Sequence, residues 1–159
     1  MHRIAFYALL IFSCVSFGCS DQGKQFAATT DRIAGYVGTG LILVDQQTTT
    51  GQMSAETGVA IVTALRSVNT LNGQLVAEAK QYVDKDGNLR LTGDGQAKLL
   101  KILDSSQAVV NTLLNDTRVT SMEPAKREQI TAIVSNISAT IVTLGELVKT
   151  VKLAKEVQK

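Results

Sequence analysis

The sequence predicts an all-α fold, an antiparallel up-down helical bundle of three to four helices that follows a cleaved signal peptide. Three observations predict it. Apolar residues recur every three or four positions in four segments. The 159-residue chain contains a single proline, and it is rich in Ala, Leu, Val, Gln and Lys, which favour helices. We expect one helical-bundle domain over residues 26–159.

The first helix is expected over about residues 24–47. Its apolar stripe consists of Phe26, Thr30, Ile33, Val37, Leu41 and Val44. Glycines at 35, 38 and 40 interrupt the segment, and each costs roughly 0.5–1 kcal/mol relative to alanine inside a helix. Either Ala34 and Gly38 allow a close helix crossing, or the helix kinks near residues 38–40.

The second helix is expected from Ser54, a candidate N-cap, to about Tyr82. Its seam consists of Ile61, Leu65, Val68, Asn72, Leu75, Ala79 and Tyr82. Asn72 interrupts the apolar residues of this seam. It either fixes the register by pairing with another polar group, at a cost in stability, or lies at an exposed edge.

The link at residues 84–91 resembles a calcium-binding loop because it contains Asp84, Asp86 and Gly87. In the EF-hand register, however, Tyr82 would take the first ligand position and Gly93 the twelfth, and neither can serve there. The composition is typical of a tight turn, so we expect a turn with a small hairpin or an extended arm.

The third helix is expected from a cap at Thr92 or Asp94 to about Asp116, and a loop at 117–121 follows. Its broad stripe consists of Leu99, Ile102, Leu103, Ser106, Val109, Val110, Leu113 and Leu114.

The fourth helix is expected from about 124 to 158, with Pro124 in its first turn. Its heptad seam consists of Ile130, Ile137, Leu144 and Val151. Lysines 149, 152, 155 and 159 gather near its end. They either complement the helix C-terminus or attract anionic headgroups or cell-wall polymers.

The N-terminus has the pattern of a secretory signal. Met1-His2-Arg3 precedes an apolar run at residues 4–17, which is too short to cross a bilayer as a helix. Gly18 and Cys19 follow. This ending resembles the lipobox of bacterial lipoproteins, although Ser16 stands where an aliphatic residue is common. Cys14, after Ile11 and Ser13, offers a second position.

The resemblance implies a lipoprotein signal peptide at 1–18 that is cut before Cys19, with fatty chains such as palmitate on the Cys19 sulfur. Residues 19–25 would form a lipidated tether. The protein would be held at a membrane of the cell envelope, and Ser20 favours the periplasmic face of the outer membrane in a Gram-negative host. The alternatives are a plain cleaved signal and a retained membrane anchor.

Composition narrows the function classes. Without residues 1–18 the chain has no histidine, and Cys19 is its one cysteine. We therefore expect no catalytic residues, no metal site and no cofactor, and we do not expect an enzyme. Loss of Arg3 leaves fifteen Lys+Arg against fourteen Asp+Glu (16 − 1 and 14), which gives no support for nucleic-acid binding.

A structural or protein-interaction role at the envelope is the function expected from these observations, through a partner protein or self-association. The alternative is a carrier that binds an apolar ligand between its helices. Lys159 also allows a further alternative, since the chain resembles in this one respect the major outer-membrane lipoprotein, whose C-terminal lysine is joined to peptidoglycan.

Overall fold

The computed structural model describes residues 22–151 and residue 153, and within these residues every regular element is a helix. The helices are α1 (Gln22–Thr49), α2 (Ala55–Lys80), α3 (Gly93–Leu114), α4 (Thr117–Thr120) and α5 (Pro124–Thr150). The only strand-like pairing in this part of the chain is one antiparallel bridge between Val83 and Leu89. The all-α prediction is confirmed.

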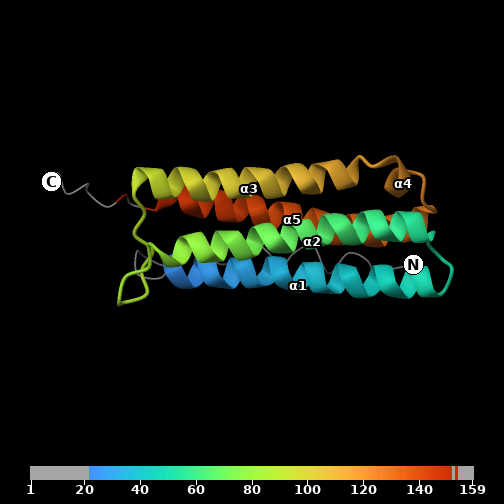
Figure 1. Cartoon of the computed structure of the whole chain (residues 1–159), viewed down its shortest axis with the longest axis horizontal. Coiled ribbons are helices and arrows are strands. Elements are labelled where there is room, and N and C mark those ends of the chain that lie inside the picture. The colour runs from blue at the N-terminus through green and yellow to red at the C-terminus, as the bar shows by residue number, and fades with distance from the viewer. Residues whose placement is uncertain (1–21, 152, 154–159) are drawn as a thin grey trace, which may run out of the picture.

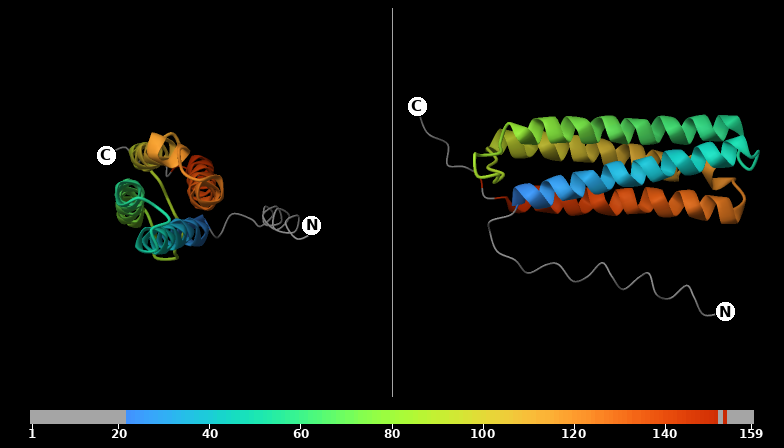
Figure 2. Two further views of the ribbon diagram at one scale, coloured as in Figure 1. Left: turned by 90° about the vertical axis from the view of Figure 1, so that its right-hand side faces the viewer. Right: turned by 90° about the horizontal axis from the view of Figure 1, so that it is seen from below.

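The four long helices lie side by side, and each runs antiparallel to the next along the chain (Figure 1). We call α1, α2, α3 and α5 the helical body. Seen end-on, α1 packs against α2 and α5, and α3 packs against the same two helices (Figure 2). Because α1 has 28 residues, the body is about 40 Å long.

The helical body has two different ends, the loop end and the α4 end. The loop end carries Gln22, the link 81–92 and Thr150; the α4 end carries the link 50–54 and residues 115–123 (Figure 1). The first and last described residues are therefore at the same end.

The core runs along the centre of the helical body, where the predicted stripes meet. The heptad seam of α5 is entirely buried, as predicted: Ile130, Ile137, Leu144 and Val151. The α2 seam is buried from Ile61 to Ala79, whereas Tyr82 is only partly covered. The burial of these aliphatic side chains is the main stabilising contribution, roughly 1.5–3 kcal/mol for each large side chain.

Close helix contact occurs at Gly40 and not at the predicted pair Ala34 and Gly38. A Cβ atom on Gly40 would lie 2.9 Å from Leu65 Cδ1 and 3.4 Å from Ile133 Cγ2, whereas nothing lies within 4 Å of one on Gly38. Ala34 is exposed. The helix is continuous through all three glycines, so the kink at residues 38–40 is not observed either.

Asn72 is buried and paired, which decides between the two roles left open by the sequence. Its Nδ2 donates to the Thr30 carbonyl of α1 over 3.0 Å, while its Oδ1 is buried without a hydrogen-bond partner. Asn72 therefore fixes how α2 is aligned along α1, and its Oδ1 remains an unsatisfied acceptor.

Glutamine side chains tie α5 to both of its neighbours. Gln47 Nε2 of α1 donates to Gln129 Oε1 over 2.9 Å, and Gln107 Nε2 of α3 donates to Ser138 Oγ over 2.8 Å. Gln96 Nε2 donates to the Val148 carbonyl over 2.9 Å. These bonds fix how α5 is aligned along α1 and α3.

The link 81–92 forms a tight turn, as predicted. Gly87 has φ of +80°, and Asp84 Oδ1 accepts from the backbone N–H groups of Asp86 and Asn88, each over 2.9 Å. Leu89 and Leu91 are buried in the core, so this segment covers the loop end of the core and does not extend as a free arm.

The start of α1 and the end of α5 differ from the expected boundaries. The fourth helix ends at Thr150, eight residues before the predicted end, because Val151 has extended backbone angles while its side chain stays in the core. Residues 152 and 154–159 lie outside the described residues. The first helix begins at Gln22, so residues 22–25 of the predicted tether are helical.

The region expected to be a loop at 117–121 contains the short helix α4. Asp116 is its N-cap and accepts from the Arg118 N–H, and Val119 is buried against the core. Ser54 caps α2 as predicted, by accepting from the Thr57 N–H. Of the two candidate caps of α3, Thr92 and Asp94, it is Thr92 that accepts from the Gly95 N–H.

Within the described residues, α5 is the one helix whose length and apolar composition would suit a membrane span. The same properties belong to a core helix, and one face of α5 packs against α1 and α3.

Candidate interaction groove

A surface groove lies between α2 and α3 near the α4 end. Two alanines of α2 lie one turn apart at residues 60 and 64, opposite Ala108 of α3. Because these side chains are short, the space between the two helices stays open, with a volume of about 760 Å³. We call it the α2–α3 groove; its other lining residues are Ala55, Glu56, Val59, Thr63, Val109, Thr112, Leu113, Asp116 and Arg118.

Most of this lining is uncharged and much of it is apolar. Val59 is 66% exposed at the groove, the highest value among the exposed large hydrophobic residues of the described chain. Val109 is partly buried beside it, and Thr63 and Thr112 present hydroxyl groups. Thr63 and Thr112 hydroxyls donate to carbonyls one turn earlier in their own helices. The lining thus offers apolar contact with few free polar groups.

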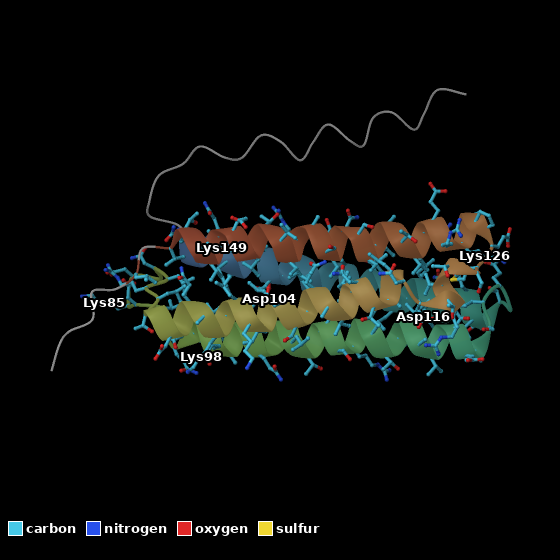
Figure 3. The ribbon with its side chains drawn as sticks, turned by 90° about the horizontal axis from the view of Figure 1, so that it is seen from above. Lys85, Lys98, Asp104, Asp116, Lys126 and Lys149 are labelled. Atoms are coloured by element: carbon cyan, nitrogen blue, oxygen red, sulfur yellow. The ribbon has the colours of Figure 1, made fainter. Side chains whose placement is uncertain are left out.

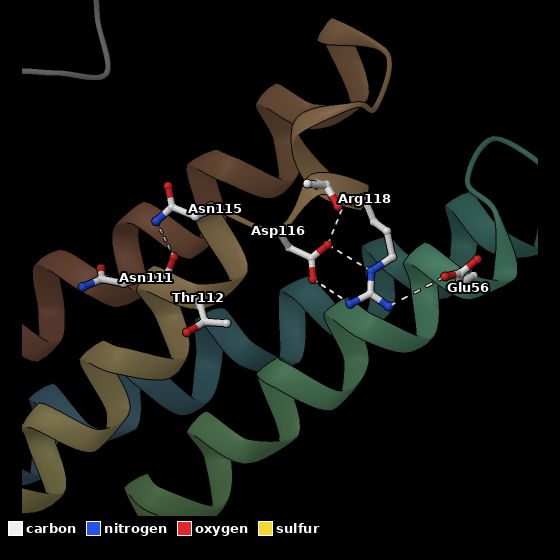
Figure 4. A pocket seen from close by; sticks show the side chains of 7 residues that line it. Glu56, Asn111, Thr112, Asn115, Asp116 and Arg118 are labelled. Carbon is white, nitrogen blue, oxygen red and sulfur yellow. Dashed lines mark hydrogen bonds and ion pairs between the residues drawn. The ribbon is translucent and has the colours of Figure 1, made fainter.

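The charged residues of the groove lie together at its α4 end (Figure 4). Arg118 donates from Nε to Asp116 Oδ1 over 2.9 Å and from Nη2 to Asp116 Oδ2 over 2.7 Å. Glu56 of α2 lies 4.0 Å from Arg118 Nη1. Hydrogen bonds from the Arg118 side chain and backbone lower the pKa of Asp116 to about 2.

The hydrogen bonds between Arg118 and Asp116 determine whether the charged end of the groove can bind an anion. Because Asp116 holds the guanidinium with two hydrogen bonds and also caps α4, Arg118 is already satisfied and is a poor site for an anion. A polar hollow of about 740 Å³ continues from it along Asn111 and Asn115. The groove is therefore suited to contact with an apolar surface that is bordered by polar groups.

The described residues contain no group of three or more His, Cys, Asp or Glu side chains that could hold a metal ion. Asp84 of the 84–91 turn is occupied instead, since Arg90 Nε donates to its Oδ2 over 2.6 Å. This bond and the backbone N–H donors lower the pKa of Asp84 to about 2.

The predicted lipidation residue Cys19, and the alternative Cys14, lie outside the described residues. Sequence reasoning missed the α2–α3 groove. The alanine spacing at 60 and 64 was visible in the sequence, but it becomes a groove only when α3 places Ala108 opposite, and which helices are neighbours cannot be read from one sequence.

Comparison of the chain with protein-family models, with curated proteins and with solved structures found no match.

Proposed function

We propose that this chain is the precursor of a bacterial lipoprotein whose mature part is an up-down helical bundle held at an envelope membrane. The observation that carries the proposal is the order of residues at the N-terminus, an apolar run at 4–17 followed by Gly18 and Cys19. The Cys19 sulfur would carry the lipid. More than one acyl chain gives stable anchoring, since each buried CH₂ contributes about 0.8 kcal/mol.

The mature protein would have a structural or protein-interaction role, with the α2–α3 groove as its partner-binding surface. The groove lies near the α4 end, whereas Cys19 is three residues before the start of α1 at the loop end. Since 16 residues of α2 separate Ala64 from Lys80, the groove would lie at least about 24 Å from the anchored end. A partner in the aqueous compartment could reach it there.

The anchor is tested by intact-mass analysis of the protein purified from its own host, with Cys19→Ser and Cys14→Ser as paired variants. We expect a chain that begins at Cys19 and carries acyl groups, unchanged by Cys14→Ser because residue 14 leaves with the signal. Cys19→Ser should retain the signal and lose the acyl groups. A cleaved chain with a bare thiol would contradict the proposal, as would full acylation of Cys19→Ser.

The groove is tested by cross-linking in envelope membranes with two matched variants. Ala108→Trp fills the α2–α3 groove, and Ala139→Trp adds the same side chain at an exposed alanine of α5. We expect the first variant to lose specific cross-linked partners and the second to keep them. Equal partner recovery from both variants would exclude the groove as the binding surface.

The volume and apolar lining of the groove also favour a second candidate, a carrier of an apolar ligand. A volume of about 760 Å³ is within the usual range for small-molecule sites, roughly 300–1,000 Å³. The ligand would lie at the surface between α2 and α3. Titration with a fluorescent fatty acid tests this function: binding that Ala108→Trp abolishes and Ala139→Trp preserves supports a carrier, and no saturable binding excludes it.

A further inference from the structure

The loop end combines exposed apolar side chains with lysines that are free to contact a surface. Val83 and Leu153 are 43% and 49% exposed. Val83 is exposed, whereas its bridge partner Leu89 is buried in the core. Lys85 lies at the tip of the same turn (Figure 3). The end thus presents aliphatic groups next to ammonium groups.

Charge is distributed unevenly between the two ends of the helical body. At the loop end the cationic residues are Lys24, Lys80, Lys85, Arg90, Lys98 and Lys149, and the acidic ones are Glu78, Asp84, Asp86, Asp94 and Glu146. At the α4 end the acidic residues Asp45, Glu56, Asp116, Glu123 and Glu128 outnumber the cationic Arg118, Lys126 and Arg127.

At the loop end, Arg90 is paired with Asp84, Lys98 with Glu78 and Lys149 with Glu146. Lys80 and Lys85 form no ion pair with another described residue. They are the cations of this end with most to gain from an anionic surface, because a lysine near such a surface is attracted to it within a Debye length.

We infer that the loop end rests directly on the anionic headgroups of the bilayer, with the long axis of the helical body pointing away from the membrane. This inference rests on the proposed lipidation of Cys19. Only Ser20 and Asp21 separate Cys19 from α1, so the backbone from Cys19 to Gln22 spans at most about 11 Å. The lipid therefore keeps Val83, Lys85 and Leu153 within reach of the headgroups.

A side-on orientation is the alternative contact with the same membrane. The outer surface of α1 and α5 has no charged residue at 33–44 or 129–145, and Ile42 and Val142 are exposed there. This surface lacks the basic groups that anionic lipid attracts, whereas the loop end has both basic and apolar groups. The end-on orientation is therefore favoured.

The test uses the full lipidated protein in vesicles, labelled at one introduced cysteine. Since Cys19 is acylated, only the new thiol reacts with the fluorophore. Val83→Cys reports on the loop end, Val59→Cys on the α2–α3 groove and Val142→Cys on the side. Quenching by nitroxide-labelled headgroups is measured in vesicles of phosphatidylcholine with and without one third phosphatidylglycerol, and acylation of each sample is checked by mass.

We expect strong quenching at residue 83 in the anionic vesicles and little at residues 59 and 142. Lys85→Glu should lower the ratio of quenched to unquenched molecules at residue 83 at least about fivefold, the contribution of one lysine at an anionic surface. Arg66→Glu makes the same charge change at an exposed site in the middle of α2 and should leave the ratio unchanged. High salt should lower it.

Quenching at residue 142 equal to that at residue 83 would overturn the end-on orientation, as would no quenching at residue 83. Equal effects of Lys85→Glu and Arg66→Glu would overturn the role of the loop-end cations. If Lys85→Glu instead reduces sedimentation with purified peptidoglycan and leaves quenching unchanged, the loop end binds the cell wall and not the bilayer, and the inference is wrong. A bare Cys19 thiol by mass would be a failure of the proposed function itself.

Discussion

Two of the glycines in the middle of α1, Gly35 and Gly40, should respond to the same substitution in opposite directions. Alanine at position 35 would extend into open space, with nothing within 4 Å of its Cβ. Alanine at position 40 would place its Cβ 2.9 Å from Leu65 Cδ1 and 3.4 Å from Ile133 Cγ2. Leu65 is almost fully buried, so its methyl group has little room to move away.

The magnitude follows from two opposing contributions. Replacing glycine by alanine inside a helix stabilises by about 0.5–1 kcal/mol, and Gly35→Ala should gain this amount. Gly40→Ala gains the same amount, but overpacking of a buried contact costs about 1–3 kcal/mol. The free energies of unfolding of the two variants should therefore differ by about 1–3 kcal/mol, with Gly35→Ala the more stable.

Urea unfolding followed by circular dichroism at 222 nm measures this difference for the chain from Ser20 onward. In a Leu65→Val background the clashing Cδ1 atom is absent, so the penalty of Gly40→Ala should shrink. If Gly35→Ala and Gly40→Ala change the free energy of unfolding equally, the close approach of α1, α2 and α5 at Gly40 is wrong. A penalty that persists in Leu65→Val would mean that Leu65 is not its cause.

Three further predictions follow from particular side chains. Asn72→Leu should be neutral or stabilise by up to about 1 kcal/mol, because the Thr30 carbonyl keeps its helical N–H donor, whereas Asn72→Asp should destabilise by about 2 kcal/mol or more. Urea unfolding at pH 7 compares the two variants. Equal stability of the two would contradict the buried hydrogen bond from Asn72 to the Thr30 carbonyl. Asp84 has a pKa of about 2 in the folded chain against an ordinary value of 3.8, so the unfolded chain binds more protons between these values. Stability should fall as the pH falls from about 4 to 2, and Asp84→Asn should reduce this slope, which unfolding midpoints between pH 2 and 6 measure; an unchanged slope refutes the assignment. Gly87→Ala should cost about 1 kcal/mol because φ is +80°, while Gly93→Ala, with open space around its Cβ, should not show this loss by thermal unfolding.

The long helices were predictable because their stripes repeat at helical spacing. The seams that contain Ile61, Leu75, Ile137 and Leu144 are buried as the spacing predicted. Caps at Ser54 and Thr92 were also readable, since a hydroxyl before a helix supplies an acceptor for a free N–H group. These features depend on residues close in sequence.

Features that depend on distant residues were not predictable in the same way. The close contact at Gly40 requires Leu65 and Ile133 from two other helices. Leu89 and Leu91 are buried because the turn folds back over the end of the core, and their short segment has no periodicity to indicate it. The α2–α3 groove likewise depends on which helices are neighbours.

Helix ends were predicted least well where local composition and packing disagree. The sequence after Thr150 has helical composition, yet Val151 leaves the helix while its side chain stays in the core. The α4 turn forms because Asp116 caps it and Val119 is buried, and a four-residue helix is too short for a periodic signal.

The contact between α1 and α5 has a consequence for the order in which the protein can fold. The ribosome makes α1 first, yet α5, one of the two helices that pack against α1, is the last of the long helices to be made. A nascent chain that stops before residue 124 leaves the apolar stripes of α1 and α3 uncovered on one side, a condition that promotes aggregation. Completion of the fold must therefore wait for release of nearly the entire polypeptide.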